Sequence, residues 1–360
     1  MKRLLTISLI FCLLLSATAV NAFAADTANS TGESLTQEYT DLFHKQLYRG
    51  DLDNNGKVTI DEAKQYLRIA AKLEDPQAGV DYDMTGDGRI TTDDARRVLR
   101  IASGLETAAT NEEIFEYFKK ELNSVKKEFP GFERTTVSTC TSAKVTITDA
   151  PKGLLYDFNA TNEEYVDYLK RNEKMLKMAD EAEYNKMLAE AQAVYKPIEK
   201  TKTVAPGSTS HYSYFPVVRL TYACNLDFNE VKSITFKQDG GSYIITIKLG
   251  SYTYNEKNPY PATVYDDAER QKLPYGKIFN IPEFNDTTNY ELKKVVLDKG
   301  EVILKVDAET GKILTVDYSY QCTSSVYTEA ELKDDSGKVQ STMKTTMTNV
   351  IKNQEHFVLN

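Results

Sequence analysis

The feature that most constrains this chain is a segment that occurs twice. Residues 51–74 and 83–106 match at positions 32 residues apart, and both copies end in Leu-Glu. Each copy begins with an aspartate, has a glycine five residues later and contains the sequence Leu-Arg-Ile-Ala, at Leu67–Ala70 and Leu99–Ala102. A duplicated pattern of this kind predicts one supersecondary unit that is used twice.

Both copies open with oxygen-bearing side chains spaced like the ligands of a twelve-residue calcium loop. Positions 1, 3, 5, 7, 9 and 12 of such a loop supply oxygens, and a glycine at position 6 makes the sharp turn. With Gly56 at the turn, the first copy supplies Asp51, Asp53, Asn55, the backbone carbonyl of Lys57, Thr59 and Glu62. With Gly88 at the turn, the second supplies Asp83, Thr85, Asp87, the carbonyl of Arg89, Thr91 and Asp94.

The sequence therefore predicts two Ca²⁺ sites of unequal strength. We expect the second site to be weaker, because Thr85 is neutral where the first loop has Asp53, and Asp94 is shorter than Glu62. The alternative interpretation is a pair of aspartate-rich surface turns, since Asp and Asn favour turns. The recurrence of ligand spacing, glycine and following amphipathic run in both copies favours calcium loops.

An amphipathic run follows each loop and predicts a helix. The apolar positions are Ala63, Tyr66, Leu67, Ala70 and Leu73 in the first copy, and Ala95, Val98, Leu99, Ala102 and Leu105 in the second. This spacing gives one stripe per helix, and we expect the two stripes to bury each other. Pro76 and Gly79 separate the copies and leave no room for a helix that enters the second loop.

This loop-then-helix unit resembles a type I dockerin over about residues 46–106, on the residues of Leu47–Val58 and Asp83–Leu105. The resemblance implies a calcium-folded module that binds a cohesin-like module on a scaffold protein, in an extracellular bacterial complex. It further implies partner contacts from loop positions 10 and 11 and from the following helix, here Ile60, Asp61, Arg68, Thr92, Asp93 and Arg100. The chain departs from the family in lacking the usual Ser-Thr-type pair at positions 10 and 11, and in placing the unit ahead of the larger region.

The N-terminus predicts export. Residues 1–24 have the pattern of a secretory signal peptide, with Lys2 and Arg3 before an apolar core and Ala22-Phe23-Ala24 as the cleavage site. No later stretch approaches about 20 apolar residues, so we expect no membrane span. The chain carries 44 basic and 53 acidic residues, a net charge of −9, which argues against a nucleic-acid partner. We expect a secreted protein.

Three cysteines lie beyond the signal peptide, namely Cys140, Cys224 and Cys322. Cys224 and Cys322 occupy the apolar register of predicted strands and therefore face a core. A Cys224–Cys322 disulfide is the better choice if a disulfide forms, whereas the odd count favours buried free thiols. The sequence leaves both alternatives open.

We expect a multi-domain chain. Its parts are an N-terminal extension with helical spacing at 25–45, a small all-α calcium-binding module at 46–106, a linker at 107–110 and an α+β domain at 111–360. The last of these has helical spacing before Pro130, a capping box at Thr161–Glu164, and a helical stretch to about Tyr195. The predicted strands are 135–147, 212–228, 232–237, 242–254, 290–297, 301–306, 313–332 and 338–351. Short connections, including Asp298-Lys299-Gly300, predict a long-stranded antiparallel sheet packed on helices.

No catalytic motif is evident in the sequence, so we name no catalytic residue. The three histidines are His44, His211 and His356, and the chain has no Trp. A tyrosine surface for sugars is one alternative for Tyr252, Tyr254, Tyr260, Tyr265 and Tyr275, and half-buried structural tyrosines are the other. The favoured function is a non-catalytic, calcium-dependent docking subunit or adaptor. The alternatives are a polysaccharide-degrading glycoside hydrolase recruited to a scaffold, and a calcium-stabilised protein whose repeat packs on its own C-terminal region.

Overall fold

The computed structural model describes residues 35–149, 159–208, 214–216, 222–255, 273–281, 290–333 and 338–360. Six α-helices lie in these residues: α2 (Leu35–Leu47), α3 (Ile60–Ala70), α4 (Thr92–Ala102), α5 (Asn111–Glu128), α6 (Asn162–Arg171) and α7 (Glu173–Ala193). The strands are β1 (Phe132–Asp149), β2 (Asn159–Thr161), β3 (Ile198–Val204), β4 (Val231–Asp239), β5 (Ser242–Leu249), β6 (Tyr252–Asn255), β7 (Tyr290–Asp307), β8 (Ile313–Lys333) and β9 (Val339–Leu359). None of these helices is long and apolar enough to cross a membrane.

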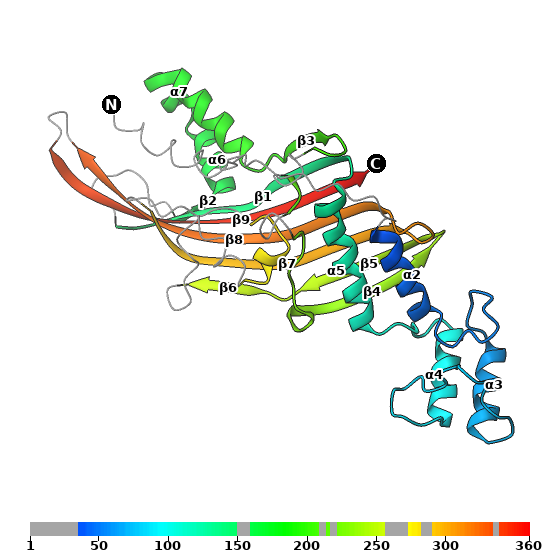
Figure 1. The fold of residues 1–360 in the computed structure, drawn as a ribbon. Helices are drawn as coiled ribbons and strands as arrows, with labels where there is room; N and C mark the ends of the chain where they lie inside the picture. Colours follow the sequence, from blue (N-terminus) through cyan, green and yellow to red (C-terminus); the bar gives the residue numbers. More distant parts are fainter. Residues whose placement is uncertain are drawn as a thin grey trace.

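One curved antiparallel sheet dominates the described part of the chain (Figure 1). Its order is β2-β1-β9-β8-β7-β5-β4, with β3 pairing on β1 and β6 pairing on β7. The two longest strands, β8 and β9, pair from Thr315 opposite Val358 to Lys333 opposite Val339. Strands of this length must twist and coil, which gives the sheet a concave side.

The main core lies between one face of the sheet and helix α5. Alternate residues of the strands point into it, among them Tyr243, Ile245 and Ile247 of β5 and Val302, Leu304 and Val306 of β7. Helix α5 contributes Phe115, Phe118, Leu122 and Val125, which recur every three or four residues and are buried in the same core. Thr110 and Glu113 form a capping box that fixes where this helix begins.

Helix α2 confirms the helix that the apolar spacing before the first loop predicted. It packs on α5 and on the sheet. Phe43 of α2 stacks on Tyr117 of α5 with ring centroids 4.1 Å apart, and it meets Tyr243 of β5 edge-on at 5.8 Å. Residues 108–110, which follow the second copy, also pack against the rest of the protein, because Ala108 and Ala109 are buried and Thr110 caps α5. Both ends of the repeat therefore join the core of the sheet.

This packing corrects the expected fold class. We expected a multi-domain chain with a small all-α module followed by a separate α+β domain, and that division is wrong. The structure is mostly one large antiparallel sheet with helices. Helix α2, which the sequence suggested as part of the N-terminal region, shares its core with α5 and the sheet. Helices α3 and α4 are an excursion from that core, and Figure 1 shows them beyond the ends of α2 and α5.

The expected strand at 212–228 is also wrong where the structure describes it. Residues 223–227 form no strand, and their backbone is hydrogen-bonded by other parts of the chain, including a side chain of α5. The Asn123 Oδ1 atom accepts from the N–H groups of Ala223 (2.7 Å) and Cys224 (2.9 Å), and its Nδ2 atom donates to the Cys224 carbonyl at 2.9 Å. The burial does not follow the expected alternation, because the adjacent Ala223 and Cys224 are both buried whereas Tyr222 and Phe228 are exposed.

The cysteines settle one open alternative. Cys140, Cys224 and Cys322 are all buried free thiols. Burial raises the pKa of the Cys224 thiol to about 12, and burial also raises the pKa of the Cys322 thiol to about 12. Because the thiolate is the reactive form, these two residues are inert members of the core.

The Asp298-Lys299-Gly300 segment is not the hairpin turn that its composition predicts. Strand β7 runs through it, with a register shift against β8 between Asp298 and Glu301. On the other side of β7 the same irregularity separates β5, which pairs with residues 301–307, from β6, which pairs with residues 294–297. The predicted strand at 242–254 is therefore two strands.

Gly300 allows Tyr275 to pack against this bulge, and we predict that Gly300→Ala destabilises the protein. A Cβ atom at Gly300 would lie 2.7 Å from the Tyr275 Oη atom and 2.8 Å from its ring, and Tyr275 is fully buried. Overpacking of this kind costs about 1–3 kcal/mol, measured by urea unfolding. The control is Gly250→Ala, where nothing lies within 4 Å of an added Cβ. Equal stability of the two variants would contradict the role of Gly300.

Candidate metal centre

The first loop of the repeat folds around the carboxylate of Asp51. Its Oδ2 atom accepts from the Gly56 N–H at 2.8 Å, and its Oδ1 atom accepts from the Asn55 N–H at 3.2 Å. Gly56 has φ of +80°, in the left-handed region that glycine adopts without strain. This is the sharp turn that the sequence predicted at position 6.

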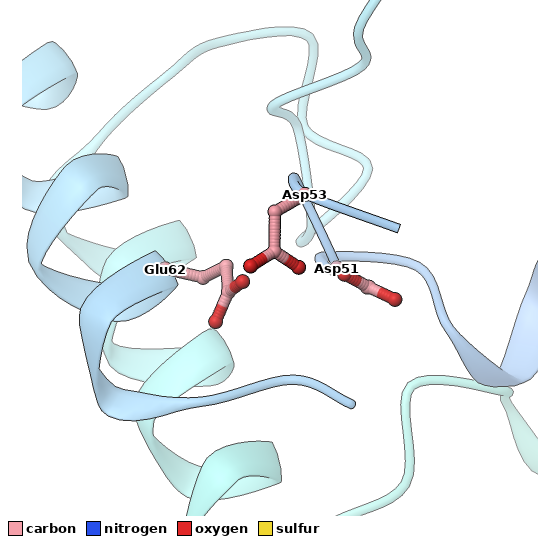
Figure 2. Close-up of side chains that lie close together, drawn as sticks. All are labelled: Asp51, Asp53 and Glu62. Carbon is pink, nitrogen blue, oxygen red and sulfur yellow. The ribbon is translucent and has the colours of Figure 1, made fainter. Parts of the chain in front are cut away.

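Three carboxylates gather at this loop (Figure 2). Ligand oxygens of Asp51, Asp53 and Glu62 all lie within 4.8 Å of one another. Asp51 and Asp53 come from the loop, whereas Glu62 comes from the first turn of α3 and is buried. Carboxylate oxygens at this mutual distance match the ligand preference of a hard cation such as Ca²⁺. The cluster contains positions 1, 3 and 12 of the predicted ligand set.

The second loop repeats the geometry of the first at its position-1 aspartate. Asp83 Oδ2 accepts from the Gly88 N–H at 2.6 Å and Asp83 Oδ1 accepts from the Asp87 N–H at 3.1 Å, with Gly88 at φ +79°. The Gly88 N–H is the main reason why the pKa of Asp83 lies below its usual range. The second loop differs at position 12, because the Asp94 Oδ1 atom accepts from the Thr85 N–H at 2.9 Å.

The two loops also differ in how many carboxylates they bring together. In the described residues, the first loop alone brings three acidic side chains within 4.8 Å of one another. Thr85 replaces the aspartate at position 3, and its hydroxyl donates to Asp83 Oδ1 at 3.3 Å. The remaining predicted ligand positions, Asn55, Lys57, Asp87 and Arg89, are exposed at the loop surface.

Each loop passes into its helix through a capping box that the sequence analysis did not identify. The Glu62 carboxylate accepts from the Thr59 N–H at 2.8 Å, and the Asp94 carboxylate accepts from the Thr91 N–H at 2.7 Å. The Thr59 hydroxyl also donates to Glu62. The signal was present as Thr-x-x-Glu and Thr-x-x-Asp. The position-12 carboxylates therefore both begin the helices and face the loops.

Helices α3 and α4 pack on each other through only part of the predicted stripes. The buried side chains are Ala63, Tyr66, Ile69, Tyr82, Met84, Ala95 and Val98. In contrast, Leu67 and Leu99 are 49 % and 44 % exposed, and Leu73 and Leu105 are 74 % and 69 % exposed. The expectation that these four leucines are buried is wrong, because Tyr82 and Met84 fill the space between the helices instead.

The residues that the family resemblance implied as partner contacts are all exposed. They are Ile60, Asp61, Arg68, Thr92, Asp93 and Arg100. Equivalent ion pairs occur in both copies: Arg68 Nε lies 2.8 Å from Glu74 Oε1, and Arg100 Nε lies 2.6 Å from Glu106 Oε1. Each arginine therefore pairs with the glutamate that ends its own copy of the repeat.

Other chemistry-bearing residues lie away from the repeat. His356 of β9 pairs with Asp317 of β8 at 2.5 Å on an exposed face of the sheet, and His44 packs edge-on to Tyr243. His211, Tyr260 and Tyr265 lie outside the described residues. Tyr254 and Tyr275 are buried and Tyr252 packs edge-on to Tyr275, so these three are core residues and not an open aromatic surface.

Comparison of the chain with family models, curated proteins and solved structures finds no match. The residues of the repeat and their geometry are therefore the basis for a functional proposal.

The double role of Glu62 leads to a prediction that separates helix capping from ion binding. Glu62→Gln keeps an oxygen that accepts from the Thr59 N–H but removes a charge, so we expect helix α3 to persist while calcium affinity falls. Glu62→Ala removes the acceptor as well, and loss of a capping interaction costs about 0.5–2 kcal/mol. Hydrogen exchange of residues 60–70 and calorimetric calcium titration measure the two effects. Equal exchange of α3 in both variants would contradict the capping role.

Proposed function

We propose that this chain is an exported, non-catalytic adaptor that binds two calcium ions in its repeat and docks through helices α3 and α4 on a cohesin-like module. The observation that carries the proposal is the convergence of Asp51, Asp53 and Glu62 at a loop whose sequence and position-1 geometry recur 32 residues later. The resemblance of residues 46–106 to a type I dockerin supports the choice of partner.

Calcium would complete the first loop with the oxygens it already presents. Asp51, Asp53 and Glu62 supply charge, and the Lys57 carbonyl together with the side chains of Asn55 and Thr59 would complete the predicted set. The second loop would use Asp83, Thr85, Asp87, the Arg89 carbonyl, Thr91 and Asp94. Because the core between α3 and α4 is small, with seven buried side chains, the free energy of ion binding would contribute much of the stability of this helix pair.

The exposed leucines support a docking role. Leu67 and Leu99 occupy equivalent positions of the two copies, as do Leu73 and Leu105, and all four face solvent. Exposed apolar side chains are available to be buried in a protein interface. Arg68 and Arg100 follow Leu67 and Leu99 in sequence, and Ile60, Asp61, Thr92 and Asp93 lie in the first turns of the same helices.

Such a protein would function outside the cell. The predicted signal peptide at 1–24 lies outside the described residues, and it supports secretion on its sequence alone. Calcium is abundant outside cells, so even sites with dissociation constants of about 10⁻⁴ M would be filled.

Calcium binding is tested by calorimetric titration of the full mature chain. We expect two ions per wild-type chain, with the tighter ion lost in Asp51→Ala, the weaker ion lost in Asp83→Ala, and no binding in the double variant. The physical reason is that each aspartate accepts the N–H groups that shape its loop and also supplies a ligand oxygen.

The control for these variants is Asp61→Ala. Asp61 is exposed, pairs with Lys64 at 2.7 Å and is not in the predicted ligand set, so its replacement removes the same charge without touching a site. We expect Asp61→Ala to bind two ions. Two ions in the Asp51→Ala, Asp83→Ala double variant would contradict the calcium proposal.

Docking is tested by binding to a panel of cohesin modules in the presence of calcium and of a chelator. We expect calcium-dependent binding to one of the modules, and about 1–2 kcal/mol lost for each of Leu67→Ala and Leu99→Ala if these residues are central to the interface. Leu42→Ala is the matched control, because Leu42 is 48 % exposed on α2, outside the repeat. Calcium-dependent binding that the two leucine variants leave unchanged would contradict the proposed surface.

A second candidate function is supported by contacts between the repeat and the rest of the chain. Arg49, just before the first loop, pairs with Glu113 of α5 at 2.5 Å, and Arg97 of α4 donates to the carbonyl of Ala108. These contacts would let calcium stabilise the protein from within and without a partner. The absence of binding to any cohesin module, together with calcium uptake by the repeat, would favour this second function.

A further inference from the structure

A buried carboxyl group lies where helix α2 packs on helix α5. Glu121 of α5 is 0 % exposed, and its Oε1 atom accepts from the Thr40 hydroxyl of α2 at 3.3 Å. The Thr40 hydroxyl also lies 2.9 Å from the Tyr117 Oη atom. Thr40 is itself fully buried, so these three side chains form a closed polar contact between the two helices.

The second carboxyl oxygen has no partner in this contact. Glu121 Oε2 is buried and makes no hydrogen bond. A buried carboxylate is costly unless its oxygens are paired, whereas a neutral carboxyl group is tolerated much better. The geometry of this interface therefore suits the protonated form of Glu121.

The charged and titratable groups around Glu121 reinforce this preference. On α5 these are Tyr117 and Glu128, and Glu128 adds negative potential. On α2 the titratable neighbour is Tyr39, and on the sheet Tyr243 lies against Tyr117 with ring centroids 6.4 Å apart. Burial is the main cause that raises the pKa of Glu121 to about 9, while the hydrogen bonds from Thr40 and Tyr117 lower it.

We propose that Glu121 makes the docking of helix α2 sensitive to pH, so that α2 is held on α5 while this carboxyl group is neutral and is released as it ionises. The release of α2 also regulates the first calcium loop, and this part of the inference rests on the proposed calcium function. Helix α2 leads directly into that loop, because the Tyr48 N–H donates to the His44 carbonyl and the Asp51 N–H donates to the Tyr48 carbonyl, both at 3.0 Å. Release of α2 loosens the start of the loop and weakens calcium binding.

The direction of the effect follows from linkage. In the released state Glu121 is in water and ionises with a pKa of about 4.3. In the docked state its pKa is raised, so docking is strongest below the released pKa and weakens as pH rises toward the docked value. When α2 is released, Glu121 loses up to one proton to the solvent. The docking equilibrium constant therefore falls by up to about tenfold per pH unit between these two pKa values.

Hydrogen exchange of the full mature chain tests the switch without any variant. After correction for the chemical exchange rate, the protection of residues 35–47 should fall at least about tenfold between pH 6 and pH 8, since linkage allows up to tenfold per unit. Protection of residues 323–326 of β8 should stay constant, because none of the residues paired with them on β7 and β9 carries a carboxyl group. Constant protection of residues 35–47 across this range would overturn the proposal.

A neutral variant identifies the group. In Glu121→Gln the protection of residues 35–47 should be the same at pH 6 and pH 8. The matched control is Glu116→Gln, on the same helix but exposed, which should retain the fall seen in the wild type. If Glu121→Gln keeps the wild-type fall, Glu121 is not the switch. If Glu121→Gln does not fold, the wild-type measurement and the Glu116→Gln control still decide whether α2 is released.

Calcium titration at the two pH values tests the link to the first loop. Loss of a proton from a carboxylate ligand would strengthen calcium binding, so a first site that is weaker at pH 8 than at pH 6 must reflect the release of α2 and not the ligands. Glu121→Gln should remove this difference. Affinity that does not change with pH in the wild type would overturn the link, and no calcium binding at either pH would overturn the proposed function while leaving the exchange result to decide the switch.

Discussion

The packing of helices α2 and α5 on the sheet is the interaction on which the rest of the described structure depends. Phe43 stacks on Tyr117 and meets the rings of Tyr243 and Phe236 edge-on, so a single side chain joins both helices to the sheet. Aromatic side chains bury large areas and favour these geometries. Because α2 precedes the repeat and α5 follows it, this contact brings together the two ends of the repeat and holds them at one end of the molecule.

The α2–α5 contact connects the repeat of residues 51–106 closely to the rest of the chain. The helix pair α3–α4 has its own small core, yet its first loop begins at the end of α2 and its last helix connects through the buried Ala108 and Ala109 to α5. The Arg49–Glu113 ion pair lies at this junction, with both side chains partly buried. The first loop is thus physically connected to the α2–α5 contact, whereas Leu67, Leu73, Leu99 and Leu105 of the repeat are exposed to solvent.

The sequence predicted the features that depend on local chemistry. The two loops were placed correctly because Gly56 and Gly88 are needed at positive φ and the aspartates ahead of them accept the following N–H groups. The capping box at Thr161 was confirmed for the same reason. Most of the sheet strands followed from alternation. The short strands β2 and β3 were missed, since their sequences carry no strong apolar alternation.

The features that depend on contacts distant in sequence could not be predicted. The sequence is compatible with packing of Phe43 on the repeat or on the sheet, and the structure places it on the sheet. Leu67 and Leu99 have the spacing of buried residues, but Tyr82 and Met84 occupy that space. The alternation at 222–228 was interpreted as a strand, although Asn123 replaces the neighbouring strand as the hydrogen-bond partner. In each case the local pattern was compatible with more than one packing arrangement, and residues distant in sequence decided between them.

The central claim is that the oxygens gathered at the first loop hold a calcium ion, and crystals of the mature protein grown with calcium test it most directly. Anomalous diffraction should show a peak between the carboxylates of Asp51, Asp53 and Glu62, with oxygen distances of about 2.3–2.6 Å. A weaker peak should appear at the second loop. Ordered loops with no anomalous peak at millimolar calcium would contradict the account.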